Sequence, residues 1–405
     1  MNHVMRYLYL VIINCVFLLS CREVENSSYT AERNDAYVDL SVCDDKTVLF
    51  SDVIDSIEYI PLETGEQCLI GYITKIIPVG DTIVVVDNER ANRVFLYDMN
   101  GKFIRQISSR GDSPESYVSL RDVAIDKQGG RVFILDAATM RLLMFSMDGN
   151  FIKSMKLPFV AHAMEYIGGE KMVFYFKVKN PSLLNEEGKY PLLGLWDMKS
   201  EKLLHVGVYQ DDEILQGAKV MSLNPLCMTS EGDVAFIQDA CDTIYSVTTD
   251  GIKVKHIFYV NEDNRKNIQE YIGGLKGATN LKEALSLRKT YPFYTLQRQV
   301  FSGGIYVVGL VSADKSYMVF INEDKEMMVA VGDKKTPMIK NDMDKISPFQ
   351  MRAGDDNGYV YSVIEPKDII LPQSIRLSPV LDILRNRVDK NDNPIIVKFK
   401  MKKQW

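Results

Sequence analysis

The sequence predicts an all-β fold, a six-bladed β-propeller of four-stranded antiparallel blades with small helical insertions. Two segments, 83–107 and 131–155, contain the same elements in the same order at an offset of 48 to 49 residues. Each has an apolar run ending in Asp, a polar turn, a second apolar run, and an Asn-Gly or Asp-Gly pair followed by Phe-Ile. A third copy lies at 234–257. A repeat of about 40 to 50 residues with several short strands is typical of propeller blades.

The N-terminus has the charged, apolar and small order of an export signal. Arg6 precedes a mostly apolar stretch at 8–19, which is short for a membrane span of about 20 residues. The box L-L-S-C at 18–21 resembles the processing site of bacterial lipoproteins, which implies cleavage before Cys21 and acylation of Cys21 by fatty acids such as palmitate. The alternative is an uncleaved signal anchor in which Cys21 is unmodified.

The domain organisation follows from this start. We expect a lipoprotein signal peptide at 1–20 and a flexible tether at 21–47, because the residues after Cys21 are polar and show no periodic pattern. The propeller is expected at 48–405. An isolated early strand at 57–62 has no partner nearby in the sequence. We expect it to pair with the last blade, because joining the first and last strands closes the ring and removes two exposed edges.

The residues in the turns of the three clearest repeats predict a type of hairpin. Gly101, Gly149 and Gly251 each follow Asn or Asp. Both central residues of a type I′ turn need a positive φ, which Asn, Asp and Gly tolerate best. The sequence therefore predicts a type I′ hairpin before the outermost strand of these blades.

The other blades are weaker repeats. The third is expected at 171–178 and 192–208, split by an insertion at 180–191, the fifth at 304–331 with a hairpin at 322–326, and the sixth at 358–364 and 394–401. Two segments break the β pattern, 264–289 within an insertion at about 261–292, and 378–388 with Ser378 as N-cap and Pro379 at the first helical position. Both are expected to be helical decorations of a propeller face.

Composition excludes some functions. The net charge is −6 and there is no basic stripe, so nucleic acid is not an expected partner. The four histidines, His3, His162, His205 and His256, show no metal-ligand spacing. Beyond the signal and its processing site, the cysteines are Cys43, Cys68, Cys227 and Cys241. They form no CxxC motif and are interpreted as buried thiols, although an exported protein could pair them.

Charged residues at the ends of predicted strands are candidates for the mouth of the central channel. Asp87, Asp136 and Asp239 each end a second strand. They could form a ring of acids that holds a cation, or each could accept backbone N–H bonds in its own turn, and their repetition favours the second interpretation. The complete channel-mouth set is Asp87, Arg90, Arg110, Asp112, Asp136, Arg141, Asp239 and Asp242.

Two further features are candidates for binding. Arg110-Gly111-Asp112 matches an adhesion tripeptide, but a turn permitted by glycine between blades one and two is the simpler interpretation. The insertions at 180–191, 210–219 and 261–292 are long loops on a rigid scaffold, where recognition often occurs. Their candidate binding residues are Tyr190, Arg265, Tyr271 and Tyr291. These residues could instead fasten the insertions to the propeller.

The chain resembles the Gram-negative six-bladed β-propeller lipoproteins, which are relatives of NHL-repeat propellers. The resemblance covers 48–402 and is carried by SDVIDSIEYIPLET at 51–64, LIGYITKI at 69–76, SSRGDSPESY at 108–117 and NPIIVKFKMK at 393–402. It implies an exported protein that is lipid-anchored to the outer membrane, at the cell surface or facing the periplasm, often beside nutrient-uptake systems. The loop at 108–117 lacks two glycines that relatives carry, so this turn is expected to differ.

Two hypotheses for function remain. The first is a non-enzymatic binding lipoprotein whose propeller face holds a glycan, a peptide or a component of an outer-membrane importer. No Ser-His-Asp order, P-loop or HExxH motif is present, and no cofactor is predicted. The second is a metal-dependent enzyme of the lactonase or lyase type, which would hold a divalent cation such as calcium at the channel centre through carboxylate and amide oxygens.

Overall fold

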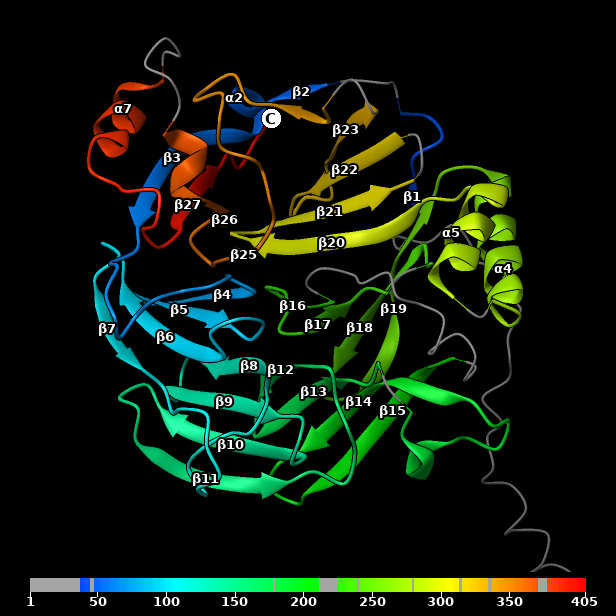
Figure 1. Ribbon diagram of the computed structural model, residues 1–405. Helices are drawn as coiled ribbons and strands as arrows, with labels where there is room; N and C mark the ends of the chain where they lie inside the picture. Colours follow the sequence, from blue (N-terminus) through cyan, green and yellow to red (C-terminus); the bar gives the residue numbers. More distant parts are fainter. Residues whose placement is uncertain are drawn as a thin grey trace, which may run out of the picture. The chain divides into compact units, whose positions relative to one another are not determined.

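Six four-stranded antiparallel sheets form the blades of a propeller in the computed structural model, which confirms the predicted fold class (Figure 1). Cys21 and Asp239 lie outside the residues that the structure describes, as do the predicted signal peptide and most of the predicted tether. The described residues are 37–43, 47–177, 179–210, 225–238, 240–278, 280–312, 315–333, 337–370 and 377–405.

The strands of the first three blades follow one another in chain order. Blade one contains β4 (Lys75–Val79), β5 (Thr82–Asp87), β6 (Arg93–Asp98) and β7 (Phe103–Gln106). Blade two contains β8 (Leu120–Asp126), β9 (Arg131–Asp136), β10 (Arg141–Ser146) and β11 (Phe151–Lys156). Blade three contains β12 (Ala163–Gly168), β13 (Lys171–Tyr175), β14 (Tyr190–Asp197) and β15 (Lys202–Gln210). The predicted insertion separates β13 from β14 and includes the short helix η1 (Pro181–Leu183).

The remaining blades include the weaker repeats. Blade four contains β16 (Leu226–Met228), β17 (Val234–Phe236), β18 (Thr243–Thr248) and β19 (Gly251–Tyr259). Blade five contains β20 (Thr295–Ser302), β21 (Ile305–Val311), β22 (Lys315–Ile321) and β23 (Met327–Asp333). Blade six contains β25 (Ala353–Gly354), β26 (Tyr359–Ile364), β27 (Ile395–Met401) and β3 (Ile54–Pro61).

The outermost strand of blade six comes from the other end of the chain. β3 pairs antiparallel with β27, so that Ile60 lies opposite Ile396 and Ile57 opposite Phe399. This confirms the predicted pairing of the early strand with the last blade. The pairing covers an edge of β27 that would otherwise expose a row of unpaired backbone groups.

The hydrophobic core lies between the blades. Val84 and Val94 of blade one, for example, pack against Val123 and Val132 of blade two. Similar clusters of buried apolar side chains fill the other interfaces between neighbouring blades. Because both faces of a blade are covered, its central strands are continuous apolar runs rather than alternating ones.

The N-terminal residues of the described chain correct one expectation. The tether was expected to extend to residue 47, but β1 (Tyr37–Asp39) is a fifth strand on the outer edge of blade four, beside β19. β2 (Val48–Leu49) then pairs in parallel with β24 (Ile339–Lys340), and α2 (Phe50–Val53) leads into β3. The exposed edge of β19 explains the difference, because it can accept an additional short strand without any hydrophobic periodicity in that strand.

The hairpin turns also differ from the expected type. Gly101 and Gly149 both have φ of +82°, as the sequence predicts, but the preceding Asn100 and Asp148 do not have a positive φ. The N–H of Gly101 donates to the carbonyl of Asp98 at 3.0 Å. The carboxylate of Asp98 accepts the N–H of Asn100 at 2.8 Å. A local hydrogen bond of this kind stabilises an ordinary turn followed by one left-handed glycine, rather than a type I′ turn.

Helices occupy both of the expected insertions. α4 (Glu262–Leu275) and α5 (Leu281–Thr290) form a helical hairpin, and α6 (Pro366–Ile369) and α7 (Pro379–Arg385) precede β27. The hydroxyl of Ser378 accepts the N–H of Leu381, as expected for an N-cap. No helix in the described part of the chain is long and apolar enough to span a membrane.

Two glycines provide a matched test of the contact between blade one and the closing strand. Both have φ of +82°, but a Cβ at Gly101 would lie 2.1 Å from the carbonyl oxygen of Pro61, whereas a Cβ at Gly149 would have no neighbour nearer than 3.7 Å. Gly149→Ala is expected to lower the free energy of unfolding by about 1–2 kcal/mol through backbone strain alone. Gly101→Ala is expected to lower it by about 1–3 kcal/mol more. Urea unfolding measures both, and equal losses would contradict the close contact.

Candidate functional site

A cavity of about 460 Å³ lies on the propeller axis. Its walls are the innermost strands of the six blades, β4, β8, β12, β16, β20 and β25, with residues of the adjoining turns (Figure 1). Small-molecule sites in proteins typically have volumes of about 300–1,000 Å³. The cavity is therefore large enough for a small ligand and is built on rigid elements.

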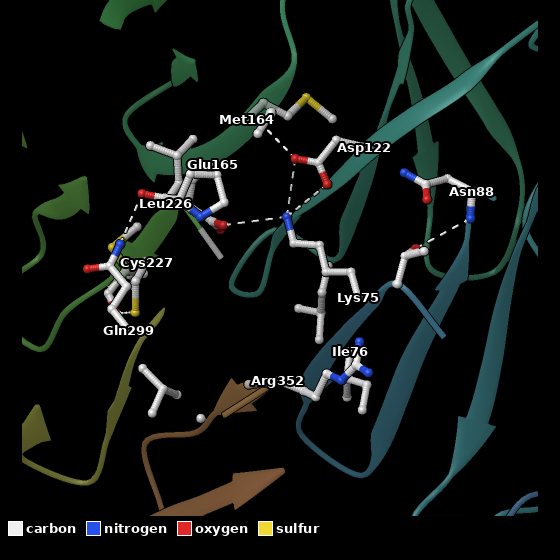
Figure 2. A pocket seen from close by; sticks show the side chains of 18 of the residues that line it. Lys75, Ile76, Asn88, Asp122, Met164, Glu165, Leu226, Cys227, Gln299 and Arg352 are labelled. Atoms are coloured by element: carbon white, nitrogen blue, oxygen red, sulfur yellow. Dashed lines mark hydrogen bonds and ion pairs between the residues drawn. The ribbon is translucent and has the colours of Figure 1, made fainter. Parts of the chain in front are cut away.

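A charged cluster spans three blades on one side of the cavity (Figure 2). Lys75 Nζ of β4 donates to Asp122 Oδ1 of β8 at 3.1 Å and lies 3.8 Å from Glu165 Oε2 of β12. The same ammonium donates to the carbonyl of Val123 at 2.7 Å. Asp122 in turn accepts the backbone N–H of Met164 at 2.8 Å. The cluster therefore joins the inner strands of blades one, two and three.

Burial and charge act in opposite directions within this cluster. Burial lowers the pKa of Lys75, but the negative charges of Asp122 and Glu165 outweigh this effect, and the pKa of Lys75 is raised. Burial raises the pKa of Glu165, and the positive charge of Lys75 only partly opposes this, so the pKa of Glu165 stays above its ordinary value. Lys75 is therefore a stable cation, and Glu165 is its less strongly ionised partner.

A second group of polar side chains lies toward blades five, six and one. Arg298 is on β20, Arg352 precedes β25, and Tyr72 precedes β4. Arg352 donates to the carbonyl of Ile73 at 3.1 Å and to the Tyr72 hydroxyl at 3.4 Å. Its guanidinium carbon lies 5.6 Å from the centre of the Tyr72 ring. Figure 2 shows Arg352 apart from the cluster around Lys75.

His162 also lines the cavity. Burial lowers its pKa to about 4, and the positive charges of Lys177 and Arg121 act in the same direction. Its ring makes an edge contact with Tyr175, with 5.8 Å between the ring centres. The imidazole is therefore neutral at pH 7 and adds no charge to the cavity.

The aspartates that end the second strands hold the entry to the first strand of their own blade. Asp87 accepts the N–H groups of Gly71 and Tyr72 at 2.7 and 2.8 Å. Asp136 accepts those of Val118 and Ser119 at 3.1 and 3.0 Å. Neither aspartate lines the cavity, since both carboxylates are fully buried in these turns. Of the two interpretations that the sequence left open, this arrangement matches the one in which each aspartate accepts backbone N–H bonds near its own turn.

The other channel-mouth candidates in the described chain also lie outside the cavity lining. Arg141 donates to the carbonyl of Ser116 at 2.9 Å and so fastens the loop that carries the Arg-Gly-Asp tripeptide. Arg110 and Asp112 in that loop are exposed. Arg90 follows Asp87 in the turn after β5, and its guanidinium donates to the carbonyl of Gly71 at 3.3 Å.

The binding candidates in the insertions make contacts within the protein. Arg265 of α4 donates twice to Asp242, at 3.0 and 2.9 Å, so a loop candidate and a channel-mouth candidate pair with each other. Tyr271 is buried between the two helices, and Tyr291 packs against the same cluster. Tyr190 is only 8% exposed and begins β14 instead of lying in the insertion loop. These contacts fasten α4, α5 and the insertion of blade three to the propeller.

The cysteines form no disulfide among the described residues. Cys68 and Cys241 are buried, and burial raises the pKa of Cys241 to about 11 and that of Cys227 to about 12. Within the described ranges, no group of three or more His, Cys, Asp or Glu side chains is arranged to hold a metal ion.

Sequence reasoning missed the charged residues of the cavity itself. Lys75 and Glu165 each interrupt an innermost strand that is otherwise largely apolar, whereas Asp122 and Arg298 lie in innermost strands with several other polar residues. A charged residue in the first strand of a blade could therefore have indicated a residue of the cavity lining. The repeated positions, such as Asp87 and Asp136, instead support the blades.

Comparison with known proteins gives a family and a fold. The family model described as a domain of unknown function (DUF4934) matches residues 37–400. A solved structure from Bacteroides fragilis NCTC 9343, of a protein described as exported, is similar over 91% of this chain and 99% of its own, with 14% identity and a TM-score of 0.72. A DUF4221 member from Bacteroides vulgatus covers 86% of this chain and 97% of its own, with 10% identity and a TM-score of 0.49. No curated protein matches the sequence.

Removing the cation of the charged cluster tests its energetic role. Lys75→Met leaves the carboxylates of Asp122 and Glu165 without their ammonium partner in the cavity wall. The free energy of unfolding at pH 7 is expected to fall by about 3 kcal/mol. Lys127→Met is the matched control, because Lys127 also lines the cavity but its pairing with Asp356 is long, at 3.8 Å, and exposed. Its effect is expected to stay within about 0.5 kcal/mol.

The loss in Lys75→Met should depend on pH. The pKa of Glu165 is already raised by burial, and without Lys75 it rises further. A carboxyl with a raised pKa destabilises the folded state as the pH rises through that pKa. The difference between wild type and Lys75→Met is therefore expected to shrink as the pH is lowered from 7 toward 5, measured by urea unfolding. A difference that does not change with pH would contradict this electrostatic assignment.

Proposed function

The chain belongs to the DUF4934 family, and on this premise we propose that it is an exported binding protein whose axial cavity holds a small ligand. The observation that carries the proposal is the cavity itself. Strands from all six blades line it, and charged side chains converge in it from separate blades. A ring of packed blades supplies the rigid, preorganised walls that small-ligand sites require.

Binding is a better account of this geometry than the alternative of a metal-dependent lactonase or lyase. The alternative needs carboxylate or amide oxygens that converge near the axis. The repeated carboxylates of Asp87 and Asp136 are instead occupied by backbone N–H groups. The carboxylate that does point into the cavity from β8, Asp122, is paired with Lys75. The site therefore offers hydrogen bonds and charge to a ligand.

We also propose that the protein is lipid-anchored at Cys21 and attached to the outer membrane, as a relative of the NHL-repeat-like propeller lipoproteins. The processing box at 18–21 supports the anchor. The fold similarity to a Bacteroides fragilis protein described as exported supports export. In this setting, the propeller would present its ligand, or one of its faces, to a partner such as an outer-membrane importer. The partner would be reached through the exposed loops that surround the cavity.

Blocking the cavity tests the binding function. Ser119 lines the cavity, and its backbone N–H is held by Asp136, so Ser119→Trp should fill space near the axis. Ser113→Trp, in an exposed loop outside the cavity lining, is the matched control. Protein purified from its native host is denatured, and the released small molecules are identified by mass spectrometry. Wild type and Ser113→Trp are expected to release the same compound, and folded Ser119→Trp is expected to release at least about tenfold less. Equal release from Ser119→Trp would place the ligand elsewhere.

Removing the acylated thiol tests the anchor. Wild type is expected in the membrane fraction and should incorporate labelled palmitate, whereas Cys21→Ser should be soluble and unlabelled. Cys68→Ser is the control, because Cys68 is buried in the propeller. Membrane attachment of Cys21→Ser, or recovery of residues 1–20 on the mature wild-type chain, would contradict lipidation.

A further inference from the structure

The cavity is more basic than the rest of the protein. The chain has a net charge of −6, but five basic and four acidic side chains line the cavity. The basic ones are Lys75, Arg121, Lys127, Arg298 and Arg352, and the acidic ones are Glu89, Asp122, Glu165 and Asp356. The lining therefore has an excess of one positive charge in a protein whose net charge is negative.

Two of the basic side chains in the lining have acidic partners within the lining. Lys75 is neutralised by Asp122 and Glu165, and Lys127 lies 3.8 Å from Asp356. Arg298, on the opposite side of the lining, has no such carboxylate partner among the described residues. Arg298 forms no hydrogen bond or ion pair with any residue in the described part of the chain.

Arg298 and Arg352 line the same cavity, and the positive charge of each acts against the other. They come from neighbouring blades, and β20 contacts β25. Burial lowers the pKa of Arg298, and the positive charge of Arg352 lowers it further. Two like charges in a partly desolvated wall destabilise the empty site, and a bound anion would reverse this repulsion into two attractions.

The geometry of these groups suits a planar or tetrahedral oxyanion. A guanidinium presents several N–H donors in a fixed fork that matches carboxylate and phosphate oxygens. Arg352 is already oriented by the carbonyl of Ile73 and by the ring of Tyr72. An orientation fixed before binding reduces the entropy lost when the ligand arrives.

We propose that Arg298 and Arg352 form an anion subsite, which binds a carboxylate or a phosphate-type oxyanion of the ligand in the axial cavity. This inference rests on the proposed binding function and names the class of its ligand. The cluster around Lys75 lies on the other side of the cavity and would contact the uncharged, hydrogen-bonding part of the same molecule.

The test uses simple anions and does not require the natural ligand. The melting temperature of the full mature chain is measured in sodium acetate, sodium phosphate and sodium chloride at equal ionic strength, for wild type, Arg298→Gln and Arg105→Gln. Arg105 is the matched control, because it lies outside the cavity lining, where its guanidinium donates to the carbonyl of Asp148 and lies 4.0 Å from the carboxylate of the same residue. Phosphate also stabilises proteins non-specifically. This effect is the same in both variants, so the difference between them isolates the subsite.

Wild type and Arg105→Gln are expected to melt at least about 2 °C higher in acetate or phosphate than in chloride. Arg298→Gln should lose this shift and, in chloride, be as stable as wild type or more so, because one of two repelling charges is gone. A shift that is kept in Arg105→Gln and lost in Arg298→Gln identifies a carboxylate ligand if it occurs with acetate only, and a phosphate-type ligand if it occurs with phosphate only.

An equal shift in Arg298→Gln, or no shift in wild type, would overturn the subsite. A clear loss of stability of Arg298→Gln in chloride would also overturn it, because it would assign Arg298 a structural role. The proposed function is judged separately, by whether Ser119→Trp loses the compound released from the native protein. A neutral compound that is lost from Ser119→Trp would support the binding function and reject the anion subsite.

Discussion

The pairing of β3 with β27 is the interaction on which the rest of the structure depends. Blade six is assembled from both ends of the propeller sequence, so it is complete only when the chain returns to its beginning. Each blade buries its two faces against its neighbours, and an open ring would leave two such faces in water. The cavity also depends on the pairing of β3 with β27, because its walls are inner strands from all six blades. Ring closure is therefore a condition for the site as well as for the fold.

Repeated and unrepeated residues have different tasks in this ring. Asp87 and Asp136 occupy equivalent positions, and each uses its carboxylate to fix the backbone that leads into an inner strand. The residues that give the cavity its charge do not repeat in this way: Lys75 and Asp122 both lie opposite the residue before the turn aspartate of their blade, but they carry opposite charges. A periodic scaffold thus positions a set of side chains that is not periodic. This asymmetry is what allows one side of the cavity to be internally neutralised while the other side keeps positive charge.

The sequence predicts the blades well because each blade is a local unit. The Asp-to-Phe-Ile repeat, the glycines after Asn or Asp, and the N-cap at Ser378 are all short-range signals, and the structure bears them out apart from the turn type. The early strand at 57–62 could be assigned because an unpaired strand in a ring has one plausible partner. The cavity residues could not be grouped in this way, because Lys75, Asp122 and Glu165 meet only after three blades have been stacked. The placement of Arg265 and Tyr190 could not be predicted, because an aromatic or basic residue in a long insertion looks the same in a sequence whether it faces solvent or fastens the insertion.

The order in which the N-terminal strands attach has a mechanical consequence. The three-residue β1 holds blade four, the two-residue β2 pairs with β24, and only then does the eight-residue β3 complete blade six. Because each of these strands is attached to a different sheet, a tensile force that enters the chain ahead of residue 37 loads the attachments one after another, β1 first. We expect the short ones to rupture and absorb extension before the long ladder of β3 is loaded. Detachment of β1 and β2 would therefore allow the segment before the propeller to be pulled while the ring stays closed.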